Sequence, residues 1–335
     1  MVNRLHDQHV GGLIRKGSHQ ARRKVWRLYQ RAGAESLNIK EIPYHLKTLW
    51  LFTSDQVPDV LLPCTAIALS AALAGNTFQL PNQTISVLLA RTLSIWAWLW
   101  FMVLHCCMYN QRQPSSVEED AVNKPWRPLP AGRISPSTVN RLIVCIYPLG
   151  AVLSYSFGVV SIWLVFSVAC IAYNDFGGAD SNFIIRYALN GVAYACFFSS
   201  ALQVAVGSNY LISSSAWQWL ALLVLVIVTT THAQDFRDEK GDSMRGRHTV
   251  ISVFGNTGAR ILLVCAIAFW SVYIPQWLGV RTKAAVFVWS VGFRVIFLTL
   301  KGVGKGDAKL DRKMYRLWGV WMLVFGIIPL TTAWS

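Results

Sequence analysis

Long apolar runs, each able to cross a lipid bilayer, constrain the fold of this chain more than any other feature. Residues 142–173 include 32 consecutive positions without a charge, whereas a single membrane helix needs roughly 20 mostly apolar residues. Only 14% of the 335 residues are charged and 54% are hydrophobic, while a soluble domain carries about a quarter charged residues. The sequence therefore predicts an all-α, polytopic membrane protein and argues against an ordinary water-soluble enzyme.

Length and turn residues divide the apolar regions into nine predicted transmembrane helices. We place a tight turn near residues 155–158 and a break at 207–218, where Ser, Asn and Gln cluster. The predicted spans then lie near residues 57–75, 85–108, 138–155, 158–173, 187–206, 217–231, 258–276, 284–300 and 316–333. Residues 46–335 form the transmembrane domain. Residues 1–45 form a basic tail without the apolar core of a secretory signal, so we expect a membrane-surface tail, with a mitochondrial presequence as the alternative.

The basic residues indicate how the chain is oriented. If it crosses the membrane nine times, 27 of the 31 Lys and Arg residues lie on the same side, which the positive-inside rule makes cytosolic. We expect a multi-pass integral membrane protein, assigned to the endoplasmic reticulum, whose N-terminus faces the cytosol together with the loops that carry the acidic residues described next. Nucleic acid is not expected as a partner despite the net charge of +15, because the basic residues lie between apolar runs.

Between residues 60 and 300, all nine acidic residues lie in three segments on the predicted cytosolic side, around residues 118–120, 175–180 and 235–242. We interpret Asp175 and Asp180 as solvated loop charges. On a helix, Asp235, Asp238 and Asp242 stand at i, i+3 and i+7, so a single face presents three carboxylates. A hard cation such as Mg²⁺ relieves the repulsion on such a face. This spacing predicts a metal site.

A second helix face carries a comparable set of polar residues: Ser116, Glu119, Asp120 and Asn123. Basic residues flank both acidic faces: Lys124, Arg127, Arg133, Arg245 and Arg247. Guanidinium groups bind phosphate oxygens through paired hydrogen bonds. The two faces together therefore predict a site for a metal-bound diphosphate. The seven cysteines all lie in apolar stretches without metal-ligand spacing, and we expect them to be core residues.

Two motifs resemble those of the UbiA superfamily of intramembrane prenyltransferases. Residues 120–133, DAVNKPWRPLPAGR, resemble the end of its first aspartate motif, followed by DxxNKPxRPxxxG, and residues 234–242, QDFRDEKGD, resemble its second motif, DxxDxxGD. The resemblance covers roughly residues 45–335. It implies a bundle of nine transmembrane helices around a central cavity, in which Mg²⁺ assists the ionisation of an isoprenyl diphosphate.

Carried onto this chain, the resemblance implies a role for each motif residue. The implied catalytic residues are Asp120, Asp235 and Asp238. The implied metal ligands are Glu119, Asp120, Asp235, Asp238 and Asp242. The implied diphosphate-binding residues are Asn123, Lys124, Arg127, Arg133, Arg245 and Arg247.

The first motif departs from the usual NDxxDxxxD pattern. Gln113 and Ser116 stand where two of its acids belong, and the stretch QPSSVEED resembles the QxxSxxED pattern of the fungal UbiA-type, membrane-bound terpene cyclases. Glu119 is then the replacement metal ligand. Pro114 favours the first turn of a helix, so we expect the preceding span to end near Tyr109. Asp55 is interpreted as a helix-start acid, with the orientation of a motif arginine as the alternative.

The resemblance implies a terpene cyclase that converts farnesyl diphosphate to a sesquiterpene hydrocarbon in fungal secondary metabolism, with geranylgeranyl diphosphate as the next substrate. One alternative is an aromatic prenyltransferase of the same fold. Another is a transporter, although transporter acids usually lie at mid-membrane.

For the aromatic residues of the spans we expect ordinary packing rather than cation stabilisation: Trp96, Trp98, Trp100, Phe101, Tyr147, Tyr194, Phe197, Phe198, Trp270 and Tyr273. Asn190 and Gln203 either face the cavity or bond a neighbouring helix.

Overall fold

The computed structural model describes residues 41–332, and this part of the chain contains helices and no strand. The α-helices are α2 (Ile42–Thr53), α3 (Leu62–Leu73), α4 (Ile85–Gln111), α5 (Pro114–Asn123), α6 (Pro136–Phe157), α7 (Val160–Asn174), α8 (Phe183–Val206), α9 (Ser214–Thr230), α10 (Ala233–Arg245), α11 (Val250–Trp277), α12 (Thr282–Lys301) and α13 (Ala308–Ile327). Shorter helical segments are η2 (Ser54–Gln56), η3 (Val57–Leu61), η4 (Gly75–Phe78) and η5 (Ile328–Thr331). The predicted all-α class is confirmed. The basic tail falls outside the described residues, apart from its last five positions.

Each of the nine predicted spans lies on a helix, but the count of nine crossings is not confirmed. Within residues 41–332, seven helical stretches have the length and apolar composition of a complete span. Helices α9 and α10 add an eighth only if this pair, bent by 46°, forms one broken span. Helix α7 is apolar but has 15 residues, and at about 1.5 Å per residue it is shorter than the roughly 30 Å hydrocarbon core. The first span is longer than predicted, because the chain is helical from Ile42 to Leu73.

Local chemistry explains where the helices end. Gly158 follows α6 with a φ of 70°, a conformation that a residue without Cβ adopts at little cost, and this confirms the predicted turn. The predicted break after residue 206 is also confirmed, and Gln203 closes it by donating to the carbonyl oxygens of Gly207 and Tyr210. Pro114 begins α5 as expected. Helix α4, however, continues to Gln111, two residues beyond the predicted end.

Large apolar side chains cover the outside of the bundle. Leu93 on α4 is 78% exposed, and Val144 on α6 and Phe293 on α12 are each 70% exposed. Soluble monomers rarely expose apolar side chains over such wide surfaces. A helix satisfies its own backbone hydrogen bonds, so these faces are suited to contact lipid. The outer surface supports a multi-pass membrane protein.

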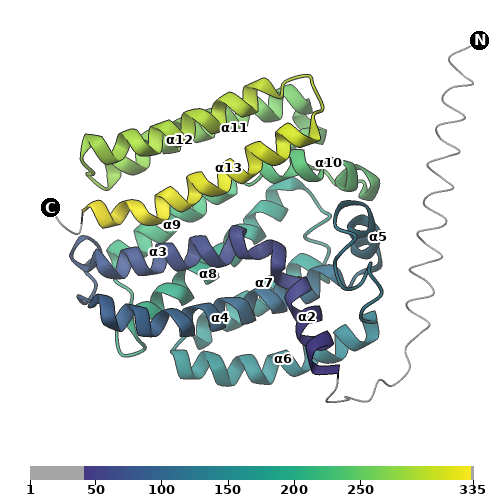
Figure 1. The fold of residues 1–335 in the computed structure, drawn as a ribbon, viewed down its shortest axis with the longest axis horizontal. Helices are drawn as coiled ribbons and strands as arrows, with labels where there is room; N and C mark the ends of the chain where they lie inside the picture. The colour runs from purple at the N-terminus through teal and green to yellow at the C-terminus, as the bar shows by residue number, and fades with distance from the viewer. Residues whose placement is uncertain (1–40, 333–335) are drawn as a thin grey trace, which may run out of the picture.

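The packing of the bundle brings α5 and α10 together at one end. Helix α8 packs against α3, α4, α7 and α9, while α13 packs against α3, α10 and α12. Helices α5 and α10 contact each other and lie beyond the same end of the long helices (Figure 1). The two acidic motifs, which are more than 100 positions apart in the sequence, therefore meet in space.

Candidate active site

A cavity of about 210 Å³ lies where α5 and α10 meet the long helices. Its lining includes six acidic residues: Asp59, Glu119, Asp120, Asp235, Asp238 and Asp242. It also includes five basic residues: Lys124, Arg127, Arg186, Arg237 and Arg247. Small and aromatic side chains from α7, α8 and α13 complete it, including Ala169, Ala193, Tyr194 and Trp318. The cavity therefore combines a highly charged part with an apolar part.

Arg127 joins the first acidic motif to the first membrane span. Its Nη1 lies 2.9 and 3.0 Å from the two carboxylate oxygens of Asp120, and its Nη2 lies 2.6 Å from Oδ2 of Asp55. Burial raises the pKa of Asp120, and the positive charge of Arg127 opposes that rise. Asp55 lies in the first turn of η2, as expected, and it also contacts a motif arginine, which was the alternative interpretation. A guanidinium buried between two carboxylates is fixed in position.

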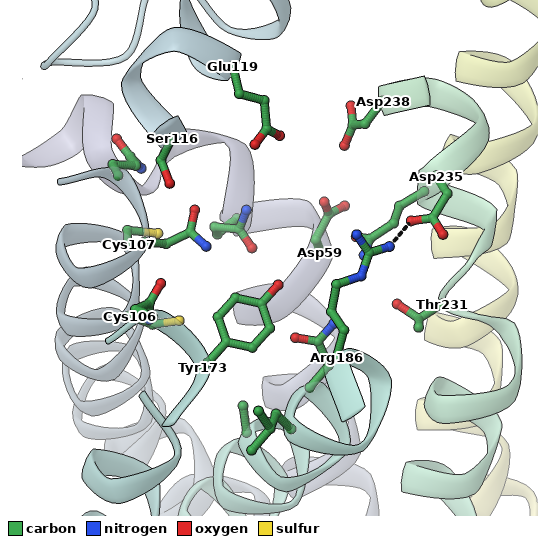
Figure 2. Close-up of a pocket in the computed structure, with 18 of the residues that line it drawn as sticks. Asp59, Cys106, Cys107, Ser116, Glu119, Tyr173, Arg186, Thr231, Asp235 and Asp238 are labelled. Carbon is green, nitrogen blue, oxygen red and sulfur yellow. Dashed lines mark hydrogen bonds and ion pairs between the residues drawn. The ribbon is translucent and has the colours of Figure 1, made fainter. Parts of the chain in front are cut away.

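Helix α10 presents its three aspartates to different partners. Asp235 accepts a hydrogen bond of 2.6 Å from Nη2 of Arg186 and another from the hydroxyl of Tyr187. Asp242 accepts one of 2.7 Å from Nη1 of Arg247, whereas Asp238 is paired with the adjacent Arg237. Figure 2 shows Asp235 bonded to Arg186 while Asp238 points toward Glu119 across the cavity.

Two arginines after the second motif tie the acidic helices to the α7–α8 loop. Arg245 donates to Ser116, Glu119 and Asp180 at 2.8, 3.1 and 2.7 Å. Arg247 bridges Glu119 and Asp180 at 3.0 and 3.1 Å. Burial raises the pKa of Asp180, but the hydrogen bonds from both arginines outweigh it and leave the pKa below its usual value. The expectation of a merely solvated charge is therefore wrong for Asp180. It is also wrong for Asp175, which binds Arg112 and Gln113.

The glycine of the second motif allows α5 and α10 to approach closely. A Cβ at Gly241 would lie 2.1 Å from Nδ2 of Asn123 and 3.0 Å from Cγ of Glu119. Asn123 uses this space to reach the backbone carbonyl of Asp238 at 3.5 Å. The amide of Asn123 therefore joins the two acidic helices in this structure.

We expect Gly241→Ala to lower turnover about 10- to 100-fold, because a shift of about 1 Å in catalytic geometry has effects of that size. The added methyl group would displace Asn123 and the stem of Glu119. Steady-state turnover and thermal unfolding in detergent would measure the effect. Gly319→Ala is the matched control, since a Cβ at Gly319 meets nothing within 4 Å. Equal turnover in the two variants would contradict the role given to this close approach.

Some of the predicted site residues lie outside the cavity lining. Arg133 stacks over the ring of Tyr44 at 4.1 Å and bonds Thr48, so the structure does not place it for diphosphate binding. Gln113, Asn123 and Arg245 are also absent from the cavity lining among the described residues, although they bond acids or backbone beside it. The remaining predicted site residues line the cavity: Ser116, Glu119, Asp120, Lys124, Arg127, Asp235, Asp238, Asp242 and Arg247.

Several cavity residues have no counterpart among the predicted site residues. Asp59 and Tyr315 come from η3 and α13, Arg186 from α8, and Arg237 from within the second motif. Asp59 and Arg186 could have been found from the sequence, because an acid or arginine at the end of an apolar run is a candidate functional residue. Asn190 faces the cavity, which decides between its two interpretations. Of the ten aromatic residues considered above, Tyr194 is the one that lines this cavity in the described chain.

The carboxylates of α5 and α10 suit magnesium in type, although not as the three-acid face predicted from spacing. Within residues 41–332, no group of three His, Cys, Asp or Glu side chains is arranged to hold a metal ion, because Asp235, Asp238 and Asp242 each turn to a different arginine. Mg²⁺, however, usually takes one or two protein carboxylates together with water and substrate phosphate oxygens. Glu119 and Asp238, which face each other (Figure 2), supply oxygen ligands of this kind.

Comparison with known proteins decides the family. The sequence profile of the UbiA prenyltransferase family matches residues 60–329. The chain belongs to this family. This UbiA-family chain is 29% identical over 296 residues to the fumagillin beta-trans-bergamotene synthase of Aspergillus fumigatus, covering 88% of this chain and 96% of the synthase. It is 25% identical over 309 residues to the somaliensene A/B synthase of Streptomyces somaliensis, covering 90% and 93%.

A solved structure supports the UbiA-type fold independently. A digeranylgeranylglyceryl phosphate synthase shares the fold with a TM-score of 0.55 at 17% sequence identity, covering 87% of this chain and 99% of that one. The family match and the two synthases identify the protein as a UbiA-type enzyme that resembles terpene cyclases. The resemblance inferred from the two aspartate motifs is thereby confirmed.

Proposed function

We propose that the protein is a membrane-bound terpene cyclase that ionises farnesyl diphosphate and closes the resulting cation into a sesquiterpene hydrocarbon. The observation that carries the proposal is the cavity in which the acidic side chains of α5 and α10 face each other. Four arginines also line this cavity: Arg127, Arg186, Arg237 and Arg247. Its relatives that are named synthases support cyclisation of an isoprenyl diphosphate.

The charged part of the cavity would bind the diphosphate. Lys124, Arg127 and Arg247 line it, and their N–H groups can donate to phosphate oxygens after exchanging a carboxylate partner. Glu119, Asp120 and Asp238 would hold Mg²⁺, with Asp235 and Asp242 beside them. The ion supplies positive charge that stabilises the departing diphosphate. Once paired with the diphosphate, these basic side chains would add to this stabilisation because their positive charge lies beside the oxygens on which negative charge develops.

The apolar part of the cavity would receive the isoprenyl chain. Ala169 and Ala193 leave room for it, while Tyr194 and Trp318 line the same cavity. Aromatic faces attract cations through their ring quadrupoles, and the surrounding helices limit the access of water to the intermediate. A chain that folds within this space can present its own double bond to the cation, without an added acceptor. We expect the cavity mouth to open toward the cytosol from the endoplasmic reticulum membrane.

Product analysis of purified protein tests this function and its alternatives. With farnesyl diphosphate and Mg²⁺ alone, gas chromatography should show a sesquiterpene hydrocarbon, and a separate phosphate assay should show an equal molar amount of released diphosphate. Removal of Mg²⁺ by a chelator should abolish both products, and restored Mg²⁺ should recover them. Strict dependence on a phenolic or quinone acceptor would instead support an aromatic prenyltransferase. Transport without diphosphate release would support a transporter.

A further inference from the structure

Asp59 differs from the other acids of the cavity in its partners. The remaining five each lie within 4.0 Å of an arginine nitrogen, whereas the ion pairs of residues 41–332 include none with Asp59. Asp59 lies in the π-helical segment η3, and its carboxylate projects into the middle of the cavity, between Asp238 and Tyr173 (Figure 2). Within residues 41–332, this carboxylate of the cavity therefore has no cation within 4.0 Å, although the charges of Arg237 and Lys124 act on it from farther away.

A hydrogen-bonded frame holds this carboxylate in place. The hydroxyl of Tyr315 donates to Oδ2 of Asp59 at 2.7 Å, and the hydroxyl of Tyr194 donates to its backbone carbonyl at 3.3 Å. One face of Tyr315 is covered by the guanidinium of Arg237 at 4.1 Å. The ring of Tyr315 also stacks with that of Trp318, with centroids 5.5 Å apart. Four residues from three helices therefore fix the position of one acid.

This frame lies where the charged and apolar parts of the cavity meet. Trp318 and Tyr194 line the space proposed for the isoprenyl chain, and Asp59 lines the same cavity. A carbocation formed from that chain would pass near a carboxylate with one oxygen, Oδ1, outside the bond to Tyr315. A group held within hydrogen-bond reach of a reacting proton can act as a general base.

We infer that Asp59 is the base that ends the cyclisation, an assignment that rests on the proposed function. In this step a C–H bond beside the cationic carbon breaks, and its electron pair forms the new carbon–carbon double bond. The proton passes to Oδ1 of Asp59, so that the positive charge of the hydrocarbon is removed. Asp59 then returns the proton to water after the product and diphosphate leave. Tyr315 acts as a positioning residue, because its hydroxyl holds the other carboxylate oxygen.

The test measures diphosphate release and hydrocarbon products separately in the wild type, Asp59→Asn and Tyr315→Phe. Asparagine keeps an oxygen that accepts the hydrogen bond from Tyr315 but does not act as the base. We expect Asp59→Asn to release diphosphate within about threefold of the wild-type rate, while the wild-type hydrocarbon falls at least about tenfold in favour of alcohols or other olefins. Tyr315→Phe should shift the same product ratio less strongly.

Controls distinguish failure of this inference from failure of the proposed function. If the wild type releases no diphosphate from farnesyl diphosphate, the proposed function itself fails. If Asp59→Asn keeps the wild-type product ratio, or loses diphosphate release together with hydrocarbon, Asp59 is not the terminating base. Tyr147→Phe removes a hydroxyl pair with Tyr109 that lies outside the cavity lining, and it should leave the product ratio unchanged. If Asp59→Asn does not fold, an unchanged product ratio in Tyr315→Phe overturns the inference.

Discussion

Asp238→Asn should lower the rate of diphosphate release by roughly 10²- to 10³-fold, the usual effect of removing one electrostatic contact to a transition state. Asp238 faces Glu119 across the cavity (Figure 2), and we propose that the two acids share the metal that holds the diphosphate. The variant should still fold, because the side chains of Asp238 and its partner Arg237 are 18% and 22% exposed. Release of diphosphate from farnesyl diphosphate would measure the effect.

Glu239→Gln is the matched control for this substitution. Glu239 is the next acid on α10, but it is exposed and lies outside the cavity lining. Glu239→Gln removes one negative charge, as Asp238→Asn does, from the adjacent position of the same helix. A near-normal rate in Glu239→Gln with a large loss in Asp238→Asn would locate the effect in the cavity. Equal rates in both variants would remove Asp238 from the site.

Asp235→Ala should destabilise the protein by about 3–5 kcal/mol in addition to abolishing turnover, because it leaves a buried arginine without its main partner. The side chain of Asp235 is 2% exposed and that of Arg186 is 5% exposed. The hydroxyl of Tyr187 also loses its acceptor. Thermal unfolding in detergent should therefore shift to a markedly lower temperature.

A double variant separates the two effects of Asp235. Replacing both members of a buried ion pair by apolar residues is often close to neutral for stability. Asp235→Ala combined with Arg186→Met should therefore recover much of the lost stability, while turnover stays absent. If the double variant unfolded at the same temperature as Asp235→Ala alone, the unpaired charge of Arg186 would not be the cause of the lost stability.

The sequence predicted the parts of the site that depend on short-range spacing. The acidic motifs, the helix start at Pro114 and the turn at Gly158 follow from residue types whose preferences are local. Charge distribution also placed both motifs at one end of the bundle. The motifs, the helix start and the turn could be predicted because each depends on neighbours within a turn or two of helix, whereas the shared end follows from the charges of all the loops.

The contacts between distant helices could not be predicted in the same way. Spacing alone placed three aspartates of α10 on one face, whereas their side chains turn to arginines from α8, α10 and the following loop. Asp59 and Tyr315, which are 256 positions apart, meet because η3 leads into α3, and α3 packs against α13. Such contacts depend on how the helices pack against each other, so they cannot be predicted from the periodicity of residues within one helix.

An experimental structure with Mg²⁺ and an unreactive farnesyl thiodiphosphate would test the proposed site most directly. The diphosphate is expected between α5 and α10, with metal contacts to Glu119 or Asp120 on one side and to Asp238 on the other. Its isoprenyl chain should extend toward Tyr194 and Trp318. A diphosphate bound at another place, or metal contacts confined to one of the two helices, would contradict the proposal that both motifs hold a single substrate.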